Sequence, residues 1–353
     1  MKIAIINDTH FGVRNDSPFF LEHILSFFQN KFIPYLIDNK IDTIIHLGDF
    51  FDRRKYINFN TLSSVRKRFI EPLVNANIKT YITLGNHDTY YRNTNDVNSI
   101  KELFQNNEHF VLIDTPTDLT FENLCMTLVP WITQENHDSI VSHIKNSSCR
   151  VIGGHFEIVG FQVVHGVKHS HGLSVSDFNK FEMVLSGHFH LKQSDKNIFY
   201  LGSQYQMNFG DVNYKKGFHV LDTNTMELLF IENENSIFHI FNYDDSSDES
   251  VKDIARFVSR TDIKGSFIRI FIREKTKQKI FDKFIDALYD KGVQDISIIE
   301  DNSISNSISS IDTVEGEDTM SIIYKEIDNI QKDVDKTKLK TIMKDLYMES
   351  LSL

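Results

Sequence analysis

The chain has 353 residues, 41% of them hydrophobic and 25% charged, which is an ordinary composition for a globular protein of two or three domains. Its formal net charge of −11 argues against nucleic acid as a partner, although bound dications and local basic patches can reverse the sign inside one cleft. No apolar run could span a bilayer and no leader pattern opens the chain, so neither a membrane partner nor export is expected.

Residues 1–104 predict an alternation of buried strands and amphipathic helices. Each strand is a short apolar run, and each helix carries apolar residues three and four positions apart. Such an alternation is typical of the α/β class. The expected elements are strands at 2–6, 43–47 and 80–84, and helices over 17–36 (bent at Pro34), 61–75 and 97–104.

Residues 105–242 predict a looser series of short strands. The only two cysteines of the chain, Cys125 and Cys149, fall here and make neither a disulfide framework nor a metal-binding pair. A reducing, cytoplasmic setting is therefore expected. The expected elements are strands at 110–114, 124–131, 150–153 and 183–185, a helix at 134–145, and several short strands up to residue 242.

A polar, acidic stretch at 243–248 predicts a domain boundary. A small unit of two helices and two strands follows it, and then a Ser-, Asn- and acid-rich segment that reads as a linker. The tail predicts two short amphipathic helices, which need a surface to lie on. The expected organisation is a main domain at 1–242, a capping domain at 243–301, a linker at 302–318 and a helical tail at 319–353.

Polar side chains follow five of the predicted strands at the point where each strand ends. In open α/β sheets the ligand crevice lies outside the carboxyl ends of the strands, so these side chains are expected to meet. Nitrogen and oxygen donors without a cysteine suit two divalent ions of the Mn, Fe or Zn kind. The candidate metal ligands are Asp8, His10, Asp49, Asn86, His155, His188 and His190.

This donor set predicts a binuclear phosphoesterase. Two ions bridged by a carboxylate can clamp both ends of an in-line phosphoryl displacement and activate a water molecule as the nucleophile. His87, next to Asn86 in the sequence, is then free to protonate the leaving oxygen. Asp88 could hold the imidazole of His87 in the required tautomer.

The same loops resemble the calcineurin-like metallophosphoesterases motif by motif. The matching motifs are Asp8-x-His10, Gly48-Asp49-x-x-Asp52, Gly85-Asn86-His87-Asp88, Gly154-His155 and Gly187-His188-x-His190. Within that superfamily the segments at 129–131, 153–157 and 168–172 make the chain similar to the SbcD and meiotic-recombination-eleven nucleases, in particular to those of T-even-like phages. The resemblance implies an α/β fold, a β-sandwich flanked by helices, with a small α/β capping domain that binds DNA.

The resemblance also implies roles for residues of this chain. Asp8, His10, Asp49 and His190 would surround one ion, and Asp49, Asn86, His155 and His188 the other, with His87 as the proton donor. Archaeal and eukaryotic members carry a histidine where this chain has Asp52, so Asp52 is expected to support a ligand instead.

The implied activity is that of a Mn²⁺-dependent DNA nuclease, with Mg²⁺ as the alternative ion. The family cleaves double strands as a 3′→5′ exonuclease and single strands as an endonuclease, in recombination, replication and repair. Its members form homodimers and bind the coiled coil of an SbcC-like ABC-type ATPase through the tail, here in the host-cell cytoplasm if a phage encodes the chain. The rival hypotheses are a phosphatase or cyclic-nucleotide phosphodiesterase on the same site, and a DNA-end-binding scaffold that no longer cleaves.

Two further clusters of polar residues each allow two interpretations. Arg53, Arg54 and Lys55 could track a DNA backbone or form a solvated helix entrance. His165, His169 and His171 could hold a third metal or belong to a solvated loop near the substrate groove. Trp131 is expected in the core.

Overall fold

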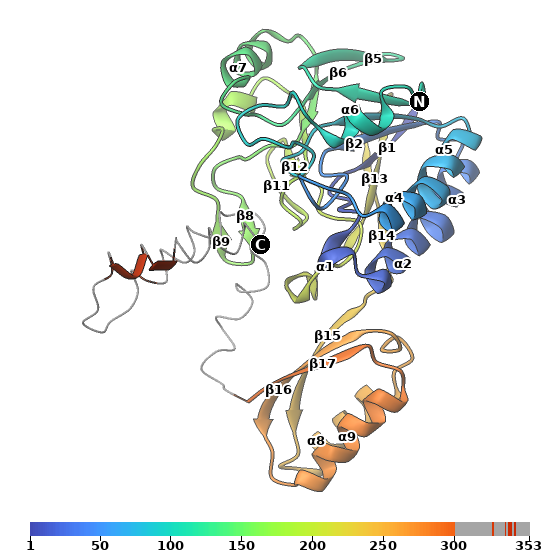
Figure 1. Ribbon diagram of the computed structural model, residues 1–353, viewed down its shortest axis with the longest axis vertical. Coiled ribbons are helices and arrows are strands. Elements are labelled where there is room, and N and C mark those ends of the chain that lie inside the picture. Colours follow the sequence, from blue (N-terminus) through green and yellow to red (C-terminus); the bar gives the residue numbers. More distant parts are fainter. Residues whose placement is uncertain (301–326, 328–335, 337, 341, 344–353) are drawn as a thin grey trace.

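The structure, a computed structural model, describes residues 1–300 together with Ile327, Lys336, 338–340, Ile342 and Met343 (Figure 1). The expected linker at 302–318 and most of the expected tail at 319–353 lie outside the described residues. Among the helices of the described part, none is long and apolar enough to cross a membrane.

Two six-stranded sheets form the main body, in the orders β14-β13-β1-β2-β3-β4 and β11-β12-β10-β7-β6-β5. One hydrophobic cluster lies between them, with Ile5 and Leu47 from the first sheet against Leu128 and Leu185 from the second. Helices cover the outer face of each sheet through two further clusters. The predicted fold class, a β-sandwich flanked by helices, is therefore confirmed.

The first sheet is parallel at its centre. Strands β1 to β4 run side by side in the same direction, while β13 and β14 add an antiparallel edge next to β1. The central strands are buried on both faces, which is why they are almost continuous apolar runs in the sequence. The strands are β1 (Lys2–Ile6), β2 (Thr43–Leu47), β3 (Lys79–Thr83), β4 (Phe110–Ile113), β13 (Lys216–Asp222) and β14 (Leu228–Asn233).

The second sheet contains a strand that the sequence pattern did not indicate. Residues 117–121 pair antiparallel with β6 across a tight turn in which Glu122 has a positive φ of 52°. The segment alternates weakly in polarity, so its pairing rests on the neighbouring strand. The strands are β5 (Thr117–Phe121), β6 (Leu124–Val129), β7 (Val151–Gly154), β10 (Met183–Ser186), β11 (Gln193–Asp195) and β12 (Ile198–Tyr200).

The two long helices over the first sheet each contain a wide, π-helical turn just before a proline. These turns, η1 (Phe28–Phe32) and η2 (Arg66–Ile70), precede Pro34 and Pro72. Proline lacks an N–H and its ring crowds the carbonyl four residues back, so a local widening accommodates it. The helices are α2 (Pro18–Phe27), α3 (Ile33–Asp38), α4 (Phe59–Val65), α5 (Glu71–Asn75) and, shorter than expected, α6 (Ser99–Phe104).

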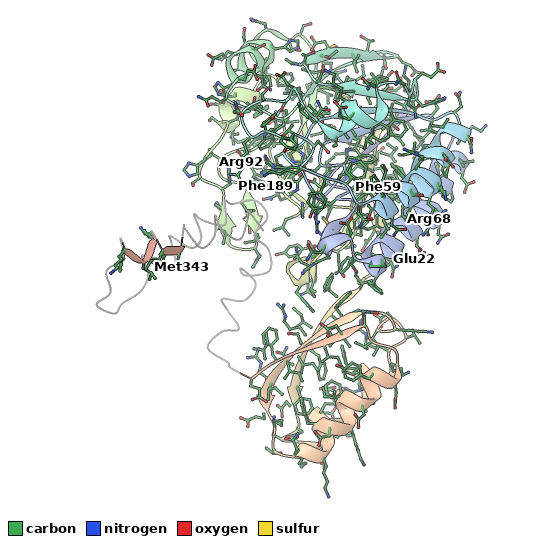
Figure 2. All side chains as sticks on the ribbon, viewed as in Figure 1. Glu22, Phe59, Arg68, Arg92, Phe189 and Met343 are labelled. Carbon is green, nitrogen blue, oxygen red and sulfur yellow. A yellow bond between two sulfur atoms is a disulfide. The ribbon has the colours of Figure 1, made fainter. Side chains whose placement is uncertain are left out.

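Ion pairing and packing hold these helices to one another and to the sheets. Arg68 of η2 donates to Glu22 of α2, and Figure 2 shows the two side chains reaching across adjacent helices. Helix α7 (His137–Asn146) covers the second sheet through Ile140 and Ile144.

A separate three-stranded sheet follows, in the order β15-β16-β17, with two helices on one face (Figure 1). Its first strand begins at Phe238, inside the segment expected to close the main domain. The ring of Phe267 stacks on those of Phe20 of α2 and Phe238, and the rings of Phe20 and Phe238 are tilted, so an aromatic cluster joins this unit to the main body. The elements are β15 (Phe238–Asp244), α8 (Asp248–Ser259), β16 (Phe267–Glu274), α9 (Gln278–Asp290) and β17 (Asp295–Ile299).

The two cysteines are joined. Cys125 on β6 and Cys149 just before β7 form a disulfide with a Cα–Cα distance of 4.8 Å. The sequence, which indicated neither a disulfide framework nor a metal-binding pair, did not predict this single disulfide, because the parallel pairing of β6 with β7 brings together residues 24 positions apart.

Candidate active site

Five loops meet at one edge of the sandwich, each directly after the carboxyl end of a strand. Strands β1, β2 and β3 are parallel neighbours in the first sheet, and β7 and β10 are parallel neighbours in the second. The loops therefore leave from the same side of both sheets and bring together all of the expected ligands. These are Asp8, His10, Asp49, Asn86, His155, His188 and His190, all buried except the partly exposed His190.

One group of donor atoms gathers around His10 and His190. Their Nε2 atoms lie 3.2 Å apart. Oδ1 of Asp8 is 3.8 Å from Nε2 of His10 and 3.7 Å from Nε2 of His190. The three ligand atoms thus surround one point, as they would around a single cation.

A second group gathers around Asn86. Its Oδ1 atom lies 3.2 Å from Nε2 of His155 and 3.1 Å from Nδ1 of His188. Oδ2 of Asp49 is 3.2 Å from Nε2 of His155 and 3.6 Å from Nε2 of His10, so this carboxylate stands between the two groups. A carboxylate in that position can bridge two ions.

The backbone of the ligand loops is held in an unusual conformation. Four candidate ligands have a positive φ, namely Asp8 (49°), His10 (40°), Asp49 (57°) and His188 (81°). For residues with a Cβ this left-handed region costs energy, and such residues cluster at functional sites. The surrounding structure therefore holds the backbone of these loops in the conformation from which the four side chains reach the site.

Gly85 is required by the close approach of the β2 and β3 loops. A Cβ atom at this position would lie 2.1 Å from Oδ1 of Asp49 and 2.4 Å from its main-chain nitrogen. Any larger residue would push Asp49 out of its place between the two donor groups.

The electrostatics of the site fit cations. Asp8 and Asp49 are 0% and 2% exposed, and buried carboxylates need positive partners. Burial opposes ionisation of Asp8, but its hydrogen bond with His10 and the charge of His155 outweigh that effect and hold its pKa well below the usual range. Burial likewise opposes protonation of His155, but Asp49 outweighs it and raises the pKa of His155 to about 9. The donor set of carboxylates, imidazoles and an amide fits two divalent ions.

The partner of His87 differs from the expected one. Nδ1 of His87 contacts the carbonyl oxygen of Asp52, whereas both oxygens of Asp88 accept hydrogen bonds from the main-chain N–H groups of Asp49, Phe50 and Gly85 at 2.8–3.0 Å. Asp88 therefore ties two ligand loops together and does not orient the imidazole. Burial, followed by the neighbouring charge of Asp49, raises the pKa of Asp88 to about 6.

The four residues at 52–55, which follow the candidate ligand Asp49, lie in different environments. Oδ1 of Asp52 lies 3.3 Å from Nδ1 of His10, on the side away from His190. Arg53 bonds to Asn15 at 2.6 Å, and Lys55 is exposed. Arg54 is partly buried, and its Nη1 atom has no hydrogen-bond partner among the described residues.

A cavity of about 300 Å³ opens over the ligands. The hairpin of β8 (Gln162–Val164) and β9 (Val167–Lys168) borders it through His165. His169 packs instead against Phe189 and His171, with ring centroids 5.3 Å and 6.2 Å away. Within the described part of the chain, the three loop histidines do not converge as a group of metal ligands.

Two residues beside the ligands were not assigned a role from the sequence. Trp131, expected in the core, is partly exposed and lies against the rings of His155 and His188. Oε1 of Glu157 is 3.3 Å from Nε2 of His188. Glu157 stands two residues after His155, in the segment at 153–157 that resembles the SbcD-like group, and that position is the signal that could have drawn attention to it.

Comparison with known proteins agrees with this geometry. Residues 1–192 match the calcineurin-like phosphoesterases. The chain is 30% identical over 354 residues to exonuclease subunit 1 of Enterobacteria phage T4, covering 99% of both proteins. It is 24% identical over 259 residues to the SbcD subunit of the nuclease SbcCD from Staphylococcus epidermidis, covering 65% of this chain and 68% of that protein. The chain therefore belongs to the calcineurin-like phosphoesterase family and is a metal-dependent hydrolase of phosphate esters.

Proposed function

We propose that the protein is a DNA nuclease that hydrolyses phosphodiester bonds with two divalent ions, Mn²⁺ being the expected ion and Mg²⁺ the alternative. The observation that carries this proposal is the position of the Asp49 carboxylate, within 3.6 Å of donor atoms in both groups. The names of the two relatives, an exonuclease subunit and a nuclease subunit, support DNA as the substrate.

Two sets of residues would hold the ions. Asp8, His10 and His190 form one set and Asn86, His155 and His188 the other, with Asp49 shared between them. When bound, divalent ions supply Lewis acidity, which polarises a phosphoryl oxygen and lowers the pKa of water. Asp52, 3.3 Å behind His10, would keep that imidazole in the orientation in which Nε2 faces the site.

His87 is the proposed general acid. Its Nδ1 atom is engaged with the carbonyl oxygen of Asp52, which leaves Nε2 to face the cavity that His87 lines. Its ring lies edge-on to that of His10, with centroids 4.8 Å apart, so the proton would be delivered next to one donor group. Protonation of the leaving oxygen at this position completes the displacement.

The proposal includes partners. The relatives are named as subunits, which supports a larger complex. The partner proposed here is an SbcC-like ATPase, bound through the tail at 319–353.

We also propose a homodimer through α4, α5 and α6, where Leu62, Val74 and Leu103 line a groove. Phe59, at the start of α4, is 86% exposed (Figure 2). Leu103→Glu should shift the mass measured by light scattering from dimer to monomer; an unchanged mass would reject this interface.

The test of the nuclease is cleavage of end-labelled double- and single-stranded DNA by the purified chain in Mn²⁺, Mg²⁺ or EDTA. Stepwise loss of 3′ label in Mn²⁺ but not in EDTA is expected. Cleavage that persists in EDTA would reject the metal mechanism. Hydrolysis of a simple phosphodiester without DNA cleavage, also after addition of the ATPase and ATP, would favour the phosphodiesterase alternative.

A further inference from the structure

A second cavity lies on the other flank of the ligands, away from His87. It has a volume of about 460 Å³, and its lining includes Trp131, His155 and Glu157. His87, His10 and His190 line the first cavity and not this one. The second cavity therefore touches the site on the side of the donor group formed by Asn86, His155 and His188.

Trp131 forms a fixed aromatic wall of this cavity. Its ring centroid is 5.7 Å from that of His155 and 5.4 Å from that of His188. Its main-chain N–H donates to the carbonyl oxygen of Leu84 at 2.8 Å, and its own carbonyl oxygen accepts from Asn95 and Asn136 at 2.8 Å and 3.0 Å. Three hydrogen bonds thus fix the main chain of Trp131, and the rings of His155 and His188 lie against its indole.

The lining combines apolar and polar side chains. Ile132 and Leu173 lie in it beside Trp131, and Asp138 and Glu157 give it two carboxylates next to the imidazole of His155. A flat, uncharged aromatic group can stack on the indole and contact the apolar side chains.

We propose that this cavity takes the unpaired base of the nucleotide next to the scissile phosphodiester, stacked on Trp131. The inference rests on the proposed nuclease function and names the part of the substrate that this flank recognises. The base and the phosphate of one nucleotide are joined through a single sugar, so a base on Trp131, which lies against His155 and His188, would bring the adjoining phosphate close to the proposed ligands. A base within a duplex cannot enter a cavity, so the strand must be unpaired at the cleavage point.

Fluorescence tests the contact directly, because Trp131 is the only tryptophan in the chain. The full chain with its ions bound, carrying His87→Gln to slow hydrolysis, would be titrated with a short single-stranded oligonucleotide and with versions in which each base in turn is replaced by an abasic site. We expect the intact oligonucleotide to quench the emission and one abasic position to abolish most of that quenching. Equal quenching by all versions would overturn the proposal.

Rates of hydrolysis show whether Trp131 stacks on a base or only packs against the proposed histidine ligands. Trp131→Leu should lower kcat/KM on the intact oligonucleotide by roughly 5- to 150-fold, the value of one base–aromatic stack, and leave that on the abasic one unchanged. Trp131→Phe should keep most of the activity. Tyr35→Leu, at a partly buried tyrosine of α3 in the helical layer, is the matched control and should change neither rate. An equal loss on both substrates would show that Trp131 only packs against the histidines.

The two proposals fail in different ways. If the unaltered chain cleaves intact and abasic oligonucleotides at the same rate, the base site is wrong and the nuclease stands. If it cleaves neither but hydrolyses a simple phosphodiester, the proposed nuclease itself is wrong.

Discussion

The two six-stranded sheets contribute different donor atoms to the same site. Every oxygen donor comes from loops of the first sheet, whereas the loops of the second sheet contribute only imidazoles. The first sheet gives Asp8, His10, Asp49 and Asn86, and the second gives His155, His188 and His190. In the proposed site the first sheet would therefore supply the negative charge that attracts a cation, and the second sheet would supply imidazole nitrogens that complete its coordination.

The largest expected effect follows from removing charge at the shared position. Asp49→Asn keeps the shape of the side chain but takes away the carboxylate that lies near both donor groups. We expect loss of hydrolysis below detection together with weaker binding of both ions, measured by an end-label assay and by calorimetric metal titration. Asp290→Asn, an exposed carboxylate on α9, is the control and should behave as the unaltered chain. Full ion binding by Asp49→Asn would contradict the division of roles between the sheets.

A smaller effect is expected at His87, which belongs to the first sheet but to neither donor group around Asn86 or His190. His87→Gln should lower kcat by roughly 10²- to 10⁴-fold, the usual contribution of a general acid. Ion binding should be unchanged, because the seven expected ligands remain. If calorimetry showed that an ion is lost, His87 would have to be counted among the ligands.

Asp52→Ala tests the support behind one ligand of the first sheet. Oδ1 of Asp52 lies 3.3 Å from Nδ1 of His10, and removing such a carboxylate typically costs about 10- to 100-fold in metal affinity or activity. We expect a loss of that size, partly recovered at higher ion concentration, in hydrolysis measured across an ion titration. If hydrolysis by Asp52→Ala depended on ion concentration as in the unaltered chain, Asp52 would not support the proposed ligand His10.

The smallest expected effect concerns stability and comes from two buried histidines that pack with the first sheet. Burial lowers the pKa of His23, in the helical layer, to about 4 and that of His219, on β13, to about 3. The unfolded chain binds protons at these histidines near pH 6.5, so the stabilisation is complete above that pH and is lost as the pH falls towards the folded-state values.

Urea unfolding would measure this effect. Between pH 7.5 and pH 5 each histidine should remove roughly 2 kcal/mol from the free energy of unfolding. His219→Gln should flatten the pH dependence by about that amount. A parallel pH dependence in this variant and the unaltered chain would show that His219 is not buried neutral.

Local patterns gave the sequence-based predictions that the structure bears out. The apolar runs that become β1, β2 and β3 are visible without knowledge of the rest of the chain, and the polar residues after them are where the strands end. What could not be predicted depends on distant partners. Asp88 bonds to main-chain groups of the β2 loop, and the disulfide joins residues on neighbouring strands far apart in sequence.

Trp131 is a second residue whose contacts could not be predicted from its neighbours in the sequence. A tryptophan after an apolar strand is statistically a core residue, and much of this side chain does pack inward. Its contacts with His155 and His188 arise because the loops after β7 and β10 end beside it, which the sequence around Trp131 does not show.

Since the proposed ligands come from both sheets, an ion would bind fully only when the two sheets are packed against each other. Such an ion acts as a clamp on the folded state: by mass action, a hundredfold excess of ion over its dissociation constant adds about 2.7 kcal/mol to the free energy of unfolding. Removal of the metal would therefore do more than stop hydrolysis. It would also lower the free energy of unfolding and weaken the packing of the two sheets against each other.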